Sequence, residues 1–221
     1  LKARYGLASC SVAPDLAEPG AMPLRAVGLV AAQTLMAMIA RRRASVVGVG
    51  HGETLAAMVN ALPAQDAKGM RFVSLLGGLT RSYAANPYDV ILKIAEKTGA
   101  EGFIIPAPLF ANTPDDRRIL FSQTSVAEIG GLWNACEVCL LGVGAVDPDG
   151  SIGRANVFDP DSSLREIRAA GARAEVLGQF LDAGGRPLST RYDGRLIAAD
   201  FFRLKGREVH AVAGGPAKVP A

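Results

Sequence analysis

Four glycine-rich turns each follow an apolar run of the sequence, and they are the first candidates for a binding site. They are Gly48-Val49-Gly50-His51-Gly52-Glu53-Thr54, Gly77-Gly78, Gly142-Val143-Gly144 and Gly214-Gly215. Glycine lets main-chain N–H groups approach a ligand closely, and a following helix N-terminus favours an anion. One such turn alone is often only a tight turn, but the four together favour a site. With the hydroxyl of Thr54 as a further donor, the first turn predicts a cradle for phosphate.

The first turn differs from the two common nucleotide-binding motifs. No Gly-Lys-Ser or Gly-Lys-Thr follows it, so it is not a Walker motif. Its glycines recur as G-x-G-x-G, but the next apolar run ends in Ser74-Leu75-Leu76, without the acidic residue of a dinucleotide site. The turn therefore matches neither motif.

Several polar side chains stand near the expected strand ends. The carboxylates are Glu53, Asp147, Glu175 and Asp182. Each could accept hydrogen bonds from sugar hydroxyls, and a pair could do acid–base chemistry only if the two converge. His51 lies inside the first turn and could touch a ligand, whereas His210 is expected to be structural. Lys218 follows the last glycine pair, where it could bind phosphate or be a solvated residue of the tail.

Cys136 and Cys139 have the C-x-x-C spacing of redox and zinc sites. They fall within an apolar run that reads as a strand, and residues three apart on a strand point to opposite faces. We therefore expect the two thiols not to converge and to be buried as small hydrophobic groups. Histidine and cysteine do not cluster at metal-ligand spacing, so no metal site and no cofactor are expected.

The elements that position these residues alternate along the chain. We expect strands at 45–50, 71–76, 102–105, 136–143, 175–181 and 208–213, and helices ending near 62, 98, 135 and 170. Asn86-Pro87 and Thr113-Pro114 are helix starts with Pro at the first helical position. This order predicts an α/β fold with a mostly parallel sheet and helices on both faces. Ligands of such sheets bind outside the carboxyl ends of the strands, where the glycine turns fall.

Composition favours one globular domain. The chain has 221 residues, of which 49% are hydrophobic, and a net charge of +3 that is too dispersed for a nucleic-acid surface. The longest apolar stretch is too short to span a bilayer, and three cysteines do not form a disulfide framework, so the cytoplasm is expected. We expect a lead-in segment over residues 1–23 and the domain over 24–221.

The ordered set of motifs resembles the sugar-binding domain of SorC-type transcription regulators. The matching stretches are Gly48-Val49-Gly50-His51-Gly52-Glu53-Thr54-Leu55, Leu75-Leu76-Gly77-Gly78-Leu79, Asn86-Pro87, Ile104-Ile105-Pro106-Ala107-Pro108-Leu109, Leu141-Gly142-Val143-Gly144, Gly178-Gln179-Phe180-Leu181-Asp182, Asp193-Gly194-Arg195-Leu196-Ile197 and Ala213-Gly214-Gly215-Pro216-Ala217-Lys218. They cover the chain from about Tyr5 to Lys218.

The resemblance implies a fold related to ribose-phosphate isomerase, glucosamine-phosphate deaminase and the CoA-transferases. It implies an effector domain that binds a sugar, sugar alcohol or sugar phosphate, catalyses nothing and forms dimers or tetramers. Operator DNA would be bound only by an N-terminal helix-turn-helix region, which this sequence lacks.

The resemblance also assigns roles to individual residues. Gly50, Gly52 and Thr54 would hold the phosphate or polar end, Gly77, Gly78 and Asn86 would line the pocket, and Glu175 and Lys218 would contact the effector. Some phosphate-sensing members carry Arg where this chain has Leu76. Without that guanidinium a bisphosphate is disfavoured, and a monophosphate or a neutral sugar stays open.

Two other functions remain open at this point. An isomerase or deaminase of the same fold would need a carboxylate base, for which Asp147 and Glu175 are the candidates. An oligomerisation module without a working pocket could use the apolar helix between Leu24 and Ala40.

Overall fold

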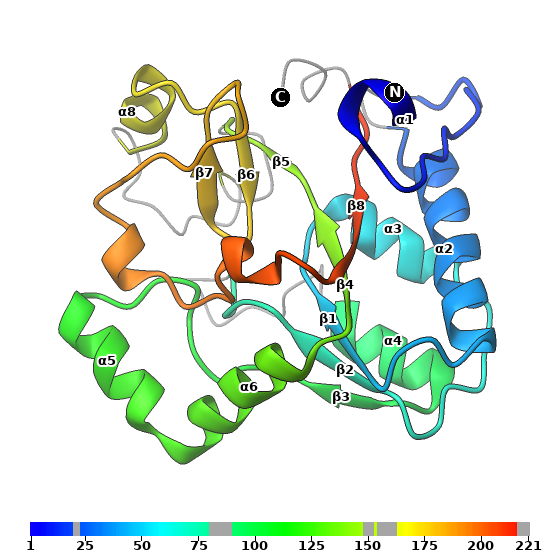
Figure 1. Cartoon of the computed structure of the whole chain (residues 1–221), viewed down its shortest axis with the longest axis horizontal. Coiled ribbons are helices and arrows are strands. Elements are labelled where there is room, and N and C mark those ends of the chain that lie inside the picture. Colours follow the sequence, from blue (N-terminus) through cyan, green and yellow to red (C-terminus); the bar gives the residue numbers. More distant parts are fainter. Residues whose placement is uncertain (20–22, 80–89, 148–152, 154–162, 216–221) are drawn as a thin grey trace.

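The computed structural model describes residues 1–19, 23–79, 90–147, 153 and 163–215, and these form two β-sheets with surrounding helices (Figure 1). The larger sheet has five parallel strands in the order β3-β2-β1-β4-β8. They are β1 (Val46–Val49), β2 (Arg71–Ser74), β3 (Glu101–Phe103), β4 (Val138–Gly142) and β8 (Glu208–Val212). The predicted parallel sheet is therefore confirmed.

Alternation along the strands builds a separate core on each face of this sheet. In β1, Val47 and Val49 pack with the helices of one face, while Val46 packs into the cluster of the opposite face. In β4, Leu140 belongs to the first cluster and Leu141 to the second. Because successive side chains of a strand point to opposite faces, these apolar runs must be covered by other elements on both faces of the sheet.

Helices cover both faces, as the sequence predicted. On the first face lie α2 (Leu24–Ala40), α3 (Glu53–Ala61) and α4 (Val90–Thr98), and on the second lies α6 (Thr124–Ala135), joined to α5 (Pro114–Ser122). Gly28 lets α2 approach α3 closely, since a Cβ there would lie 2.7 Å from the main chain of Ala57.

The helix ends follow their sequence signals. The hydroxyl of Thr113 accepts a hydrogen bond from Asp116 N–H at the start of α5. Gly99 ends α4 with a φ of 63°, which glycine adopts without strain. The expected helix start at Asn86-Pro87 lies outside the described residues. The helix expected to end near residue 170 is α8 (Ser163–Ala169).

The expected strand over residues 175–181 is wrong in one respect, because the segment is a hairpin. It consists of β6 (Ala174–Val176) and β7 (Gln179–Leu181), which pair with each other and with β5 (Gly144–Ala145) in a small antiparallel sheet. Leu177 and Gly178 connect them with φ values of 54° and 79°. Two successive positive φ values make the tight turn that matches strand twist, so the chain reverses here.

The expectation that Cys136 and Cys139 diverge is also wrong. Cys136 ends α6 instead of lying in β4, and both cysteines lie in the same core cluster on one face of the sheet. The Cys136 thiol donates to Leu132 O at 3.4 Å, and the interaction with the Cys139 thiol, with burial, raises the pKa of Cys136. Both residues are buried free thiols in the core behind the sheet, as expected for small hydrophobic groups.

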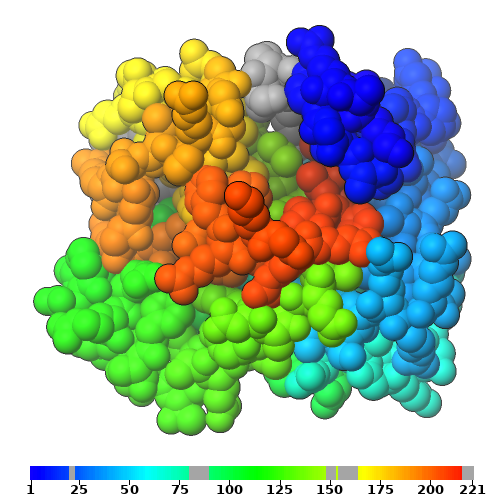
Figure 2. Space-filling model, in the orientation of Figure 1, coloured from blue at the N-terminus to red at the C-terminus, as the bar shows by residue number. Residues whose placement is uncertain are grey.

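The N-terminal residues pack on the domain. They include α1 (Lys2–Tyr5), and the Glu18 carboxylate accepts hydrogen bonds from Arg25 N–H and Ala26 N–H at the start of α2. In Figure 2 this segment, in blue, lies beside the red segment that contains β8. The remaining elements are two short 3-10 helices, η1 (Asp193–Arg195) and η2 (Phe201–Leu204). Among the described residues no helix is long and apolar enough to cross a membrane.

Candidate effector-binding site

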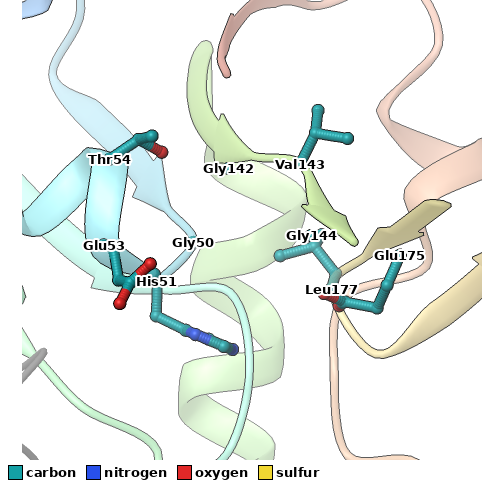
Figure 3. A pocket seen from close by; sticks show the side chains of 10 residues that line it. Gly50, His51, Glu53, Thr54, Gly142, Val143, Gly144, Glu175 and Leu177 are labelled. Carbon is teal, nitrogen blue, oxygen red and sulfur yellow. The ribbon is translucent and has the colours of Figure 1, made fainter. Parts of the chain in front are cut away.

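A cavity opens at the carboxyl edge of the parallel sheet, between the ends of β1 and β4 (Figure 3). From β1 the chain builds the sheet outward to β2 and β3, and β4 is then added on the other side. Such a reversal of strand order leaves a crevice, and ligands of α/β sheets bind there. Its empty space, including the part open to solvent, is about 370 Å³. The lining residues are Gly50, His51, Gly52, Glu53, Thr54, Gly142, Val143, Gly144, Glu175 and Leu177.

The first wall is the turn from β1 into α3. Gly52 takes a φ of 120°, and its carbonyl accepts the first helical hydrogen bond, from Ala56 N–H. The main-chain N–H groups of the first helical turn therefore have no partner within the helix. Gly142 lets β4 pass close to this turn, because a Cβ at Gly142 would lie 2.8 Å from His51 O.

The second wall comes from the small sheet. Glu175 in β6 is 6% exposed, and its carboxylate accepts a hydrogen bond from Gly178 N–H at the hairpin turn. On neighbouring β5, Gly144 is paired with Glu175, and a Cβ at Gly144 would collide with the Glu175 carboxylate. The carboxylate is thus fixed beside Gly144, and Figure 3 shows it across from the α3 side.

The described residues that line the cavity carry negative side-chain charge. Glu53 and Glu175 line it, and no Lys or Arg stands among the described lining residues. Burial lowers the pKa of His51 from its usual 6.5 to about 4, so this imidazole is neutral at pH 7. The site is built to accept hydrogen bonds with carboxylates and to donate them with main-chain amides.

Six of the predicted residues converge on this cavity: Gly50, His51, Gly52, Glu53, Thr54 and Glu175. The hydroxyl of Thr54 donates a hydrogen bond to Val212 O at 2.9 Å. This hydrogen bond links α3 to β8, and the hydroxyl hydrogen is therefore not available to a ligand. Asn86 and Lys218 lie outside the described residues.

Gly77, Gly78 and Asp147 do not line the cavity. The N–H groups of Gly77 and Gly78 donate to Ile197 O and Ala107 O, which leaves neither free for a ligand. A Cβ at Gly77 would collide with the main chain of Pro108. Asp147 is paired with Arg168 at 3.6 Å. Asp182 also stands apart, in an exposed turn, where hydrogen bonds from Arg186 N–H and Gly184 N–H lower its pKa.

Four lining residues were not predicted as individual site residues: Gly142, Val143, Gly144 and Leu177. The first three form one of the four glycine-rich turns of the sequence, and their position at the end of β4 is the signal that could have placed them beside the first turn. Leu177 carries no local signal, because it reaches the cavity only through the hairpin turn.

Comparison with known proteins gives the family of this domain. The chain matches the family Sugar-bind, described as "Putative sugar-binding domain", over residues 1–221. The erythritol catabolism regulatory protein EryD of Brucella abortus is 41% identical over 217 residues, which cover 98% of this chain and 68% of EryD. The transcriptional regulator LsrR of Klebsiella pneumoniae is 30% identical over 192 residues, or 85% of this chain and 55% of LsrR.

Solved structures agree on the fold. A DeoR family transcriptional regulator from Listeria monocytogenes superimposes with a TM-score of 0.86 at 20% identity, over 100% of this chain and 86% of that one. The full-length sorbitol operon regulator SorC from Klebsiella pneumoniae superimposes with a TM-score of 0.84 at 20% identity. The match covers 99% of this chain and 70% of SorC.

These findings confirm the predicted family and α/β fold. They favour the effector-binding role over an isomerase or deaminase, because the relatives are transcriptional regulators. The chain accordingly belongs to the Sugar-bind family and is similar over most of its length to regulatory proteins such as EryD and the transcriptional regulator LsrR.

Proposed function

We propose that this domain binds a small neutral polyol in the cavity between β1 and β4, and that erythritol is the first candidate. Binding would change the operator affinity of a regulator whose DNA-binding region is separate from this domain. The domain would catalyse no reaction and would act in the cytoplasm as a dimer or tetramer.

One observation carries the proposal: the first turn of α3, whose main-chain amides have no partner within the helix, and the buried Glu175 carboxylate line the same cavity. Each hydroxyl of a polyol can both donate and accept a hydrogen bond. Such a molecule can therefore accept from the amides and donate to the carboxylate at the same time.

The charges favour a neutral effector over a phosphate ester. Two carboxylates line the cavity, and the described lining has no cationic side chain to offset a phosphate dianion. The Thr54 proton, expected to serve a phosphate, is instead directed at Val212 O. Among the described lining residues, the attraction that remains for an anion is the N-terminus of α3.

The choice of erythritol comes from the relatives. EryD, 41% identical over nearly the whole chain, is by name a regulator of erythritol catabolism.

A ligand-binding screen tests the proposal. We expect erythritol to raise the melting temperature of the 221-residue chain, since saturation at 100 times Kd adds about 2.7 kcal/mol of stability. Threitol, longer polyols and phosphorylated erythritol should give smaller shifts.

Two charge-removing variants locate the site. Glu175→Gln should weaken erythritol binding by about tenfold or more, because a charge-assisted hydrogen bond becomes neutral. Glu101→Gln removes the same charge at an exposed position of β3 and should bind as the wild type does. Tighter binding of the phosphate ester would refute the neutral effector, and no shift with any polyol, sugar or phosphate would refute the binding function.

A further inference from the structure

The imidazole of His51 leaves a ring nitrogen without a hydrogen-bond partner beside the cavity. Its Nδ1 is buried and unpaired. Its Nε2 forms no hydrogen bond with the described residues either, but it is not sealed from solvent. Polar groups at buried sites are nearly always paired in native proteins, so an imidazole with neither nitrogen paired, on the wall of a ligand-binding crevice, points to a ligand.

The protonation state of this ring is set by its surroundings. Burial keeps the imidazole neutral at pH 7, so one nitrogen carries a proton and the other a lone pair. A sealed N–H without an acceptor is rarer in proteins than an unpaired acceptor. The proton therefore belongs on Nε2.

The other lining groups make this donor distinctive. Within the described lining, His51 and Thr54 are the residues whose side chains can donate, and the Thr54 hydroxyl already donates to Val212 O. Glu53 and Glu175 offer acceptors. In Figure 3 the His51 ring lies between the Glu53 side and the Leu177 side of the crevice.

On the basis of the proposed polyol binding, we infer that His51 is a specificity-determining residue. Its Nε2–H donates to the oxygen of one particular hydroxyl group of the effector. An effector that lacks this hydroxyl leaves the donor unpaired and binds more weakly.

A cycle of variants and ligands tests this contact by isothermal calorimetry at pH 7. The ligands are erythritol and its monodeoxy analogues, and the proteins are wild type, His51→Phe and His51→Gln. Wild type should bind one monodeoxy analogue roughly tenfold more weakly than erythritol, the usual effect of one lost hydrogen bond. His51→Phe should bind erythritol as weakly as that analogue and should no longer distinguish the two.

The controls separate a contact from a structural role. His51→Gln keeps a donor near the Nε2 position and should retain most of the discrimination. His51→Phe should unfold at the same temperature as the wild type or higher, because the variant removes an unpaired buried nitrogen.

Three results would overturn the inference: a His51→Phe chain that discriminates like the wild type, a His51→Gln chain that loses discrimination like His51→Phe, or a His51→Phe chain that is markedly less stable. Each of these leaves wild-type erythritol binding, and so the proposed function, in place. A wild-type chain that binds no polyol overturns both.

Discussion

At the scale of single residues, the cavity depends on two close approaches that glycine permits and on one histidine that stays neutral. Gly144 leaves room for the Glu175 carboxylate, and Gly142 leaves room for the carbonyl of His51. The His51 imidazole stays neutral because it is buried. The neutral state of His51 has a consequence for stability that can be measured without knowing the effector.

The depressed pKa of His51 predicts a loss of stability in mild acid. The folded-state pKa is about 4 and the ordinary value 6.5, so between these pH values the unfolded chain binds more protons. Stability therefore falls as the pH falls through this window, and the His51 contribution lost between pH 7 and pH 5 is about 2 kcal/mol.

Urea unfolding at pH 7 and pH 5 measures this loss. His51→Phe cannot be protonated and should lose about 2 kcal/mol less than the wild type over the same interval. Identical pH dependence of the two proteins would show that His51 titrates normally in the folded state.

At the scale of elements, the α2–α3 packing positions the amide end of the site. Gly28 faces the main chain of Ala57 with no space for a methyl group. Gly28→Ala should therefore destabilise the domain by about 1–3 kcal/mol, although alanine is the better helix former.

Gly131→Ala is the matched control for this prediction. Gly131 lies within α6, and a Cβ there would meet no atom within 4 Å. This substitution should stabilise the chain by up to about 1 kcal/mol. Equal effects of the two variants in urea unfolding would show that the α2–α3 contact is not tight.

At the scale of the whole molecule, the two walls of the cavity belong to different sheets. Gly50 to Thr54 follow β1 of the parallel sheet, whereas Glu175 and Leu177 belong to the small antiparallel sheet. A single residue, Val143, separates β4 of one sheet from β5 of the other. A ligand held by both walls would favour one arrangement of the sheets and so shift a conformational equilibrium.

Hydrogen exchange with and without erythritol tests this coupling. We expect slower exchange at β6, β7 and the first turn of α3, because the ligand bridges these segments. The amides of β3, at the far edge of the parallel sheet, serve as the internal reference and should not change. Protection confined to α3 would show that the small sheet does not respond to the effector.

The sequence alone determined the elements and the edge of the sheet at which the site lies. Apolar periodicity, the Thr113 cap and the Gly99 stop are local signals, and the structure follows them. The first glycine turn was also predicted to lie at the carboxyl edge of the sheet, and it lies there, because a turn between a buried strand and a helix must stand at that edge of a parallel sheet.

Only the tertiary structure decided which groups face a ligand. The Gly77 N–H donates a hydrogen bond to Ile197 O, 120 positions along the chain, and the Thr54 hydroxyl donates one to Val212 O. No local sequence pattern identifies either of these acceptors. The contact of Cys136 with Cys139 and the Leu177 turn depend on where one element ends and the next begins, to within one or two residues. Periodicity specifies a segment's type and buried face, but long-range packing decides which donors and acceptors are already used.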